Sequence, residues 1–456
     1  MDNYRAGKRS SISFGSFQRP MVNFSQNDLS YYSPRQMYAA QQPPVQQTPM
    51  AFYPCRYETA FPLYALDWSP EDYVAVGSYR EDSYNKLQIL HSSDVISWDK
   101  VGEAGTIFPV SKVQWCPNGI SQQLATSSDS LRLWTFSDFV LEEQLNLSLQ
   151  RYNKTNGNGS GSACAGNQGS TAALGQLPPV SSFHWNSTDP NLIISSSIDT
   201  TCTVWDLQSS NYVKTQLIAH DSEVFDVKFL TQSTQLFASC GGDGSVRVFD
   251  LRSLAHSTII YEPASSTRSH SREHGTGIAS ENGRGSGSGS ISGSGSGSAH
   301  GSGSAGSSAD PGRNALLRLE PSPFDPNVVA TFAQDSTSVL ILDMRYPGAP
   351  VWTLDGHSAA VNQIQWHPSR HNVLISGGDD CQALVWDINT QQASSSAATA
   401  STASTRWNNG KTSAHSIEIP QQAYDDTNYE INNLVWRPEG DWFGCNMGRQ
   451  FQAVRV

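Results

Sequence analysis

The feature that most constrains the fold of this chain is a unit of four short apolar segments that recurs along the sequence. The clearest copy spans Tyr212–Glu262, where runs rich in Val, Ile, Phe and Thr alternate with turn residues. This alternation predicts a four-stranded antiparallel meander. One such sheet cannot bury both of its faces, so other copies must pack against it. We therefore expect a repeat protein.

Seven copies of the unit can be aligned on the last residue of their first strand. These residues are Trp68, Trp115, Trp185, Phe229, Pro321, Trp366 and Trp436. The interval is 47 residues from Trp68 to Trp115, 44 from Trp185 to Phe229 and 45 from Pro321 to Trp366. Propeller blades repeat about every 40–45 residues. The sequence therefore predicts an all-β fold, a seven-bladed β-propeller.

Composition separates the repeats from segments of low complexity. Residues 1–50 are polar and rich in Ser, Gln and Pro, whereas residues 51–456 carry the repeats. Three insertions of biased composition interrupt them, at about 150–178, 263–313 and 391–425. Segments with so little apolar surface cannot offset the entropy lost on ordering. We expect a disordered N-terminal tail and three flexible surface loops.

The last copy contains only three strands, because the sequence stops at Val456. A propeller ring needs a fourth strand there, since an open sheet edge invites aggregation. The segment Phe52–Tyr57 directly precedes the first copy and belongs to no other blade. We predict that this segment pairs with the last blade and closes the ring.

The polar positions within the copies resemble those of the WD repeat. In Tyr212–Glu262 a His precedes the first strand, an Asp lies in a Gly-Gly-Asp-Gly turn, and Phe-Asp ends the third strand. The resemblance implies a WD40 propeller in which these residues form a structural hydrogen-bonded network. In that network Asp orients His, and a hydroxyl two residues after Asp continues to the indole N–H of Trp. The candidate members are His220, Asp243, Ser245, Asp199, Thr201, Trp205, His357, Asp380 and Trp386.

Recurrence of the Asp-to-Trp spacing in several blades favours this structural interpretation over a single active site. Phe249 cannot donate a hydrogen bond, so the network of its blade is expected to end at Ser245. Paired carboxylates, a phosphate-binding glycine loop and a nucleophile elbow are all missing from the sequence. We expect neither enzymatic activity nor a cofactor or metal.

Composition also excludes several classes of binding partner. The net charge of −12 argues against direct binding to nucleic acid, which requires a dense basic field. No run of 18 apolar residues occurs, so we expect no membrane span. The seven cysteines are single and form no C-x-x-C pair, which is typical of reduced thiols in the cytoplasm or nucleus.

Beyond the repeat pattern, the chain closely resembles the WD-repeat adaptor family of the plant transparent testa glabra protein and the animal adaptor of dual-specificity tyrosine-regulated kinases. The most specific matching segments are Thr200–Thr203, Lys214–Asp221 and His256–Glu262. The resemblance implies a scaffold without activity of its own that joins protein kinases, or basic helix-loop-helix and MYB transcription factors, in nucleus and cytoplasm. We expect the propeller to be monomeric within such complexes.

A second resemblance concerns substrate receptors of cullin-RING ubiquitin ligases, which often carry a W-D-x-R ending on a blade. Here two third strands end in a related pattern, in which the candidate residues are Asp250, Arg252, Asp343 and Arg345. Arg binds a carboxylate of a partner through two parallel hydrogen bonds. Alternatively, each Asp and Arg pair simply caps its strand. A substrate receptor is therefore the alternative function, ahead of a propeller enzyme or a chromatin reader.

The loop Tyr79–Asn85 is the remaining candidate contact. It is longer than a tight turn and joins the second and third strands of the first copy. Aromatic and Arg side chains often anchor protein interfaces, so Tyr79, Arg80 and Tyr84 are candidate partner contacts. The alternative is a solvated turn.

Overall fold

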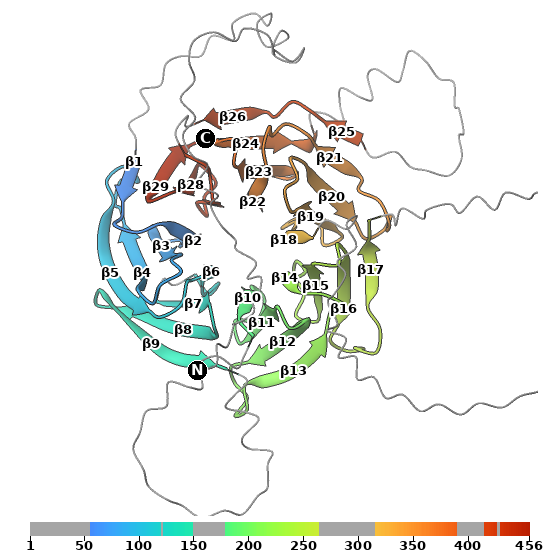
Figure 1. Cartoon of the computed structure of the whole chain (residues 1–456), viewed down its shortest axis with the longest axis horizontal. Helices are drawn as coiled ribbons and strands as arrows, with labels where there is room; N and C mark the ends of the chain where they lie inside the picture. Colours follow the sequence, from blue (N-terminus) through green and yellow to red (C-terminus); the bar gives the residue numbers. More distant parts are fainter. Residues whose placement is uncertain (1–54, 120–121, 149–177, 264–314, 390–414, 426–428) are drawn as a thin grey trace, which may run out of the picture. The chain divides into compact units, whose positions relative to one another are not determined.

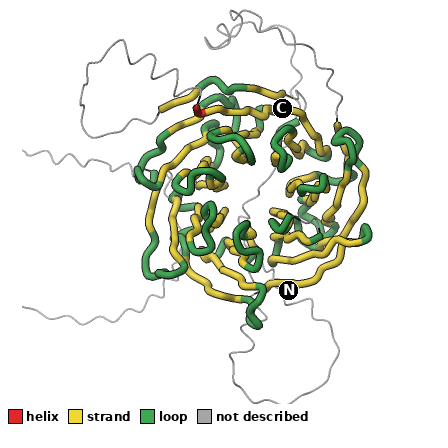
Figure 2. Tube along the Cα trace, turned by 180° about the vertical axis from the view of Figure 1, so that it is seen from behind, coloured by secondary structure: helices red, strands yellow, loops and turns green. Residues whose placement is uncertain are grey.

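The computed structural model describes residues 55–119, 122–148, 178–263, 315–389, 415–425 and 429–456. These residues form seven sheets, antiparallel except for one added strand in blade five, arranged as the blades of a propeller (Figure 1). Figure 2 shows the same ring from the opposite side, with strands in nested layers joined by short loops. The predicted seven-bladed WD40 propeller is confirmed. The tail 1–50 and most of the three insertions lie outside the described residues.

The first four blades each contain four consecutive strands. Blade one consists of β2 (Leu63–Trp68), β3 (Tyr73–Ser78), β4 (Asn85–His91) and β5 (Asp99–Thr106). Blade two consists of β6 (Lys112–Trp115), β7 (Gln123–Ser127), β8 (Leu131–Ser137) and β9 (Val140–Leu147). Blade three consists of β10 (Val180–Trp185), β11 (Leu192–Ser197), β12 (Thr201–Asp206) and β13 (Val213–Ile218). Blade four consists of β14 (Val224–Phe229), β15 (Leu236–Gly241), β16 (Val246–Asp250) and β17 (Thr258–Tyr261).

The last three blades include strands that are distant in sequence. Blade five consists of β18 (Leu316–Pro321), β19 (Val328–Ala333), β20 (Val339–Asp343), β21 (Trp352–Leu354) and β25 (His415–Ile417). Blade six consists of β22 (Val361–Trp366), β23 (Val373–Gly378), β24 (Gln382–Asp387) and β26 (Gln422–Asp425). Blade seven consists of β27 (Asn433–Trp436), β28 (Trp442–Met447), β29 (Gln450–Arg455) and β1 (Cys55–Glu58).

The hydrophobic core lies between blades rather than within any one of them. Each of the seven clusters of buried side chains combines residues of two adjacent blades. Between blades two and three, for example, Leu131 and Leu147 pack with Phe183 and Trp185. Burial of apolar area stabilises a fold by about 25 cal/mol per Å², so the blades stabilise one another around the ring.

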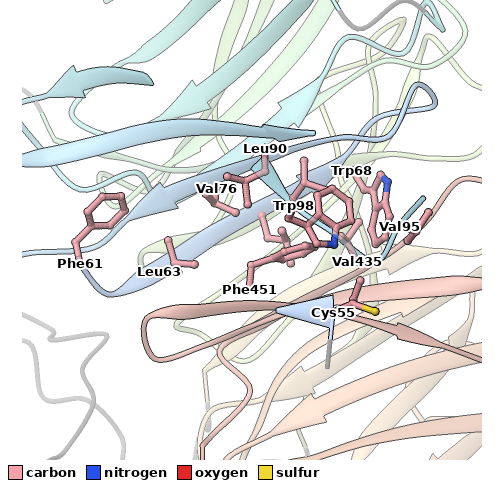
Figure 3. Close-up of a cluster of buried hydrophobic side chains, with 13 residues drawn as sticks. Cys55, Phe61, Leu63, Trp68, Val76, Leu90, Val95, Trp98, Val435 and Phe451 are labelled. Atoms are coloured by element: carbon pink, nitrogen blue, oxygen red, sulfur yellow. The ribbon is translucent and has the colours of Figure 1, made fainter. Parts of the chain in front are cut away.

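The N-terminal strand closes the ring as predicted. β1 pairs antiparallel with β29, and Tyr57 lies opposite Phe451. Figure 3 shows Cys55 of β1 in one apolar cluster with Phe451 and with Trp98 of blade one. The rings of Trp98 and Phe451 meet edge to face at 5.0 Å. The first described strand therefore completes the last sheet and seals its contact with the first.

The predicted flexible insertion at 391–425 is wrong at its C-terminal end. Residues 415–417 form β25, which pairs in parallel with β21 of blade five. Residues 422–425 form β26, which is the outer strand of blade six. The outer edge of β21 has unpaired N–H and C=O groups that accept a further strand, so the chain contacts blade five before it returns to blade six.

Candidate functional site

The described polar residues fall into four groups, of which the first is the predicted network. In blade four, His220 Nδ1 lies 3.0 Å from both carboxylate oxygens of Asp243, and Nε2 lies 2.8 Å from Ser239 Oγ. Ser245 Oγ donates to Asp243 at 2.8 Å. All four side chains are buried. This Ser-His-Asp arrangement is closed to substrate, because Ser239 is fully enclosed.

The hydroxyl that links His to Trp comes from a different strand than predicted. In blade six Ser376 Oγ lies 2.7 Å from His357 Nε2 and accepts the Trp386 indole N–H at 2.9 Å. His357 Nδ1 lies 2.9 Å from Asp380. Ser376 belongs to the second strand, not to the turn after Asp380. The prediction failed because residues ten apart in sequence become neighbours only when the second and third strands pair.

Blade three has the same indole bond without a histidine contact. Trp205 donates to Ser195 Oγ at 2.9 Å, and Asp199 instead accepts the backbone N–H and hydroxyl of Thr201. In blade four Phe249 stacks on Phe237 at 5.0 Å in place of the indole contact. The predicted end of this network at Ser245 is therefore incomplete, since the chain of contacts also reaches Ser239.

Electrostatics around Asp243 favour its ionised form. Burial by itself would raise the pKa of Asp243, but hydrogen bonds from His220 and Ser245 hold that pKa well below its usual range. The Arg247 guanidinium adds a further donor 2.9 Å from Asp243. An ionised carboxylate with this many donors fixes the turn between the second and third strands.

The second group is the loop Tyr79–Asn85, at the face where loops join second to third and fourth to first strands (the upper face). Buried Asn85 organises it by accepting from Arg80 N and by donating to Arg80 O and Asp82 O. The Arg80 guanidinium pairs with Asp82. Tyr84 is 75% exposed, whereas the Tyr79 ring packs on Tyr64 at 5.3 Å. Hydrogen bonds therefore order this loop, and Tyr84 projects from it into solvent.

The third group is the pair of strand-end arginines, at the opposite, lower face. Arg252 donates from Nε and Nη2 to both oxygens of Asp250, and Arg345 pairs with Asp343 in the same way. Arg345 also reaches Asp325 at 2.9 Å. The segment after Arg345 contacts blade four, because the Gly348 N–H donates to the Ile260 carbonyl of β17.

The arginine side chains are not required to cap these turns. In blades four and five the Asp oxygen accepts the backbone N–H two residues on, from Arg252 and Arg345. The corresponding N–H bonds exist in blades three and six, where the residues are Gln208 and Asn389. The backbone supplies the cap in all four blades. The guanidinium groups add local ion pairs with Asp250 and Asp343, as the alternative interpretation expects, and the two arginine side chains remain exposed.

The fourth group lines the central channel and was not predicted from the sequence. A cavity of about 200 Å³ lies between the first strands of the blades. Residues one position before the aligned strand ends form a lower ring of Asp67, Gln114, His184, Lys228, Glu320, Gln365 and Val435. In blades two to seven, residues three positions before those ends form an upper ring of Lys112, Ser182, Asp226, Arg318, Gln363 and Asn433.

The lower ring connects the blades through their backbones. The Asp67 carboxylate accepts the N–H of Trp115 in blade two at 2.6 Å. Gln114 accepts the N–H of Trp185 in blade three at 2.9 Å. His184 Nδ1 accepts the N–H of Phe229 at 3.1 Å, and Gln365 that of Trp436 at 2.5 Å. A polar residue before the terminal aromatic was the sequence signal for this ring.

Charges in the channel shift one another's pKa values. Desolvation raises the pKa of Asp67 to about 7, and it lowers that of Lys112 to about 8. Desolvation and the nearby Lys228 and Lys112 hold the pKa of His184 well below its usual range. Three lysine and arginine cations offset the burial of Asp226 and bring its pKa to about 2. The channel therefore holds a dense set of interacting charges.

Comparisons with known proteins agree with this geometry. The family described as WD domain, G-beta repeat, matches residues 173–206, 211–250 and 348–387. The WD repeat-containing protein YPL247C of Saccharomyces cerevisiae is 49% identical over 435 residues, which cover 88% of this chain and 76% of the relative. The chain belongs to the WD-repeat family.

Two further WD-repeat relatives cover most of their own length. An uncharacterized WD repeat-containing protein of Schizosaccharomyces pombe, C17D11.08, is 32% identical and aligns over 88% of this chain and 89% of the relative. A DDB1- and CUL4-associated factor 7 homolog of Dictyostelium discoideum is also 32% identical, over 88% of this chain and 98% of the relative. The WD-repeat similarity thus extends along the whole propeller.

The described residues show no metal or membrane element. They contain no group of three or more His, Cys, Asp and Glu side chains placed to bind a metal ion. In the same part of the chain, no helix has the length and apolar character needed to cross a bilayer.

Proposed function

We propose that this WD-repeat protein is a non-enzymatic scaffold that docks protein kinases or transcriptional regulators. The observation that carries the scaffold role is the closed seven-bladed ring, which fixes loops from every blade on a rigid frame. The partner classes are those implied by the resemblance to the plant and animal adaptor family. In nucleus and cytoplasm such partners would meet on the upper face.

The upper loop of blade one supports a docking role for that face. Its backbone is held by Asn85, which is only 2% exposed, while Tyr84 projects into solvent. An aromatic side chain on a preorganised loop loses little conformational entropy when it binds. Tyr84 and Arg80 are therefore the proposed contacts on this face.

The second candidate function is that of a substrate receptor in a cullin-RING ligase, and the lower face favours it. Arg252 and Arg345 follow the third strands of neighbouring blades, and their side chains are 68% and 52% exposed. Tyr346, next to Arg345, is 67% exposed. The Dictyostelium relative is named as a factor associated with DDB1 and CUL4. A carboxylate-bearing adaptor would pair with the two guanidinium groups.

Affinity purification of the tagged full chain from its own cells, followed by mass spectrometry, tests both functions. The unmodified protein is compared with Tyr84→Ala on the upper face and with an Arg252→Gln/Arg345→Gln double variant on the lower face. Arg370→Gln serves as the control, because Arg370 is exposed and, within the described residues, its side chain bonds Gln421 alone, at 3.3 Å. Each variant must keep the melting temperature of the unmodified chain.

The outcomes separate the two functions. A kinase or transcription factor lost only with Tyr84→Ala supports the scaffold and its upper-face contact. Cullin-ligase adaptor subunits lost only with the double arginine variant support the substrate receptor. Retention of every partner by both variants would contradict the assigned surfaces, and recovery of neither class would contradict both functions.

A further inference from the structure

The channel contains more positive than negative charge in its upper ring. Lys112 and Arg318 are cationic, and Asp226 is the one acidic member. The ring therefore carries a net charge of +1 when these three groups are ionised. Desolvation is the main reason that the pKa of Lys112 falls to about 8, and the nearby Arg318 charge lowers it further. The two cations thus repel each other across the channel.

The carboxylates of the channel are already engaged. Asp226 accepts hydrogen bonds from Ser182 at 2.6 Å and from the Leu319 N–H at 2.9 Å, and Lys112 Nζ lies 3.5 Å away. In the lower ring, Glu320 pairs with Lys228 at 2.7 Å, and Asp67 accepts the Trp115 N–H at 2.6 Å. These contacts leave no carboxylate oxygen dedicated to Arg318.

Arg318 is bound by neutral groups alone. Its guanidinium donates to the Leu317 carbonyl at 2.8 Å and across the channel to the Tyr64 hydroxyl at 2.7 Å. Among the described residues it forms no salt bridge, and Asp226 acts on it only at longer range. Arg318 is half-buried, so its partial removal from water without an anionic partner still costs free energy.

Gln363 provides a further hydrogen-bond donor to the same cavity. Its side chain lines the channel from blade six and makes no hydrogen bond within the described part of the chain. The channel therefore combines two cations with a free amide around a cavity of about 200 Å³. That volume accommodates one small anion together with a few water molecules.

We propose that the central channel binds one small monovalent anion, chloride or a single carboxylate, between Arg318, Lys112 and Gln363. The anion neutralises the upper ring and relieves the repulsion between its two cations. It also links the first strands of blades two, five and six. Occupancy therefore stabilises the propeller independently of any partner on its outer faces.

Thermal unfolding of the full chain at constant ionic strength tests this site. Chloride is replaced stepwise by lactobionate, a disaccharide acid anion that is too large for the cavity of about 200 Å³, and acetate is used in a parallel series. We expect chloride to raise the melting temperature by about 2–4 °C with saturation. A similar rise with acetate identifies a site that also accepts carboxylates, whereas a rise with chloride alone restricts the site to halide.

Two variants separate specific binding from general salt effects. Arg318→Gln should abolish the difference between chloride and lactobionate, and Arg370→Gln on the surface should retain it. Should Arg318→Gln fail to fold, anomalous diffraction from crystals of the unmodified protein in bromide decides the matter. Bromide in contact with Arg318 and Lys112 supports the site. Equal melting in all anions, or no bromide in the channel, would overturn the proposal.

Discussion

The Asp67 carboxylate accepts the backbone N–H of Trp115 across the boundary between the first two blades, at 2.6 Å. Neutral groups occupy the equivalent acceptor position at other boundaries, where Gln114 and Gln365 bond Trp185 and Trp436. The bond between the blades therefore requires a hydrogen-bond acceptor at position 67, but not a negatively charged one. Because desolvation raises the pKa of Asp67 to about 7, this connection between blades depends on pH.

We predict that Asp67→Asn removes part of the pH dependence of stability. The folded-state pKa of Asp67 is about 7, above its ordinary value of 3.8, so the folded state binds the proton more tightly. Stability from this group is complete below pH 4 and is lost as the pH rises to about 7. Between pH 5.5 and 8, the unmodified protein should lose about 1–2 kcal/mol relative to Asp67→Asn. Urea unfolding at both pH values measures the free energy of unfolding of the two proteins. If this free energy changes equally with pH in both, the raised pKa of Asp67 is contradicted.

His184 should show the opposite dependence on pH. Its Nδ1 accepts the Phe229 N–H and must stay unprotonated, and desolvation lowers its pKa below the ordinary 6.5. Stability from this group is present above pH 6.5 and is lost as the pH falls. We expect His184→Gln, which reproduces the acceptor of Gln114, to gain about 1–2 kcal/mol over the unmodified protein between pH 7.5 and 5. Urea unfolding of both proteins at these two pH values measures the change. A larger loss of stability for His184→Gln than for the unmodified protein at pH 5 would contradict the prediction.

Closure of the ring by β1 predicts a large effect of its removal. Deletion of residues 51–60 exposes the edge of β29 and the apolar side chains that Cys55 covers, Trp98 and Phe451 among them. We expect a loss of more than about 3 kcal/mol, or aggregation. Calorimetry and light scattering measure both effects, with deletion of residues 1–50 as the control. A soluble deletion variant with unchanged cooperative melting would refute the closure.

The two types of turn network should differ in their contribution to stability. Asp243→Ala removes the partner of buried His220 and an ionised group that binds Arg247, so we expect a loss of about 2–4 kcal/mol. Asp199→Ala removes bonds to Thr201 alone and should cost about 0.5–1.5 kcal/mol. Chemical denaturation of both variants compares them, and equal losses would show that the histidine contact adds nothing.

Local sequence determined the architecture. The spacing of the first-strand ends from Trp68 to Trp436, together with turn residues between short apolar runs, was sufficient to predict seven antiparallel blades. The position of Phe52–Tyr57 before the first copy also predicted the closing strand, since ring closure requires one more strand at a fixed place. These features follow from the alternation of apolar runs with turn residues and from the spacing of the repeats. Both can be read from residues that are close together in the chain.

Tertiary structure alone decided which distant side chains meet. Lys112 and Asp226 come together because the blades curve around one axis, and Ser376 reaches Trp386 only when two strands pair in register. β25 joins blade five, where it pairs with the outer edge of β21, before the chain returns to blade six. The sequence shows polar residues before the terminal aromatics, but not that they face a shared channel. These side chains meet only after a ring of several hundred residues has closed. A local sequence pattern cannot show which residues that closure brings together.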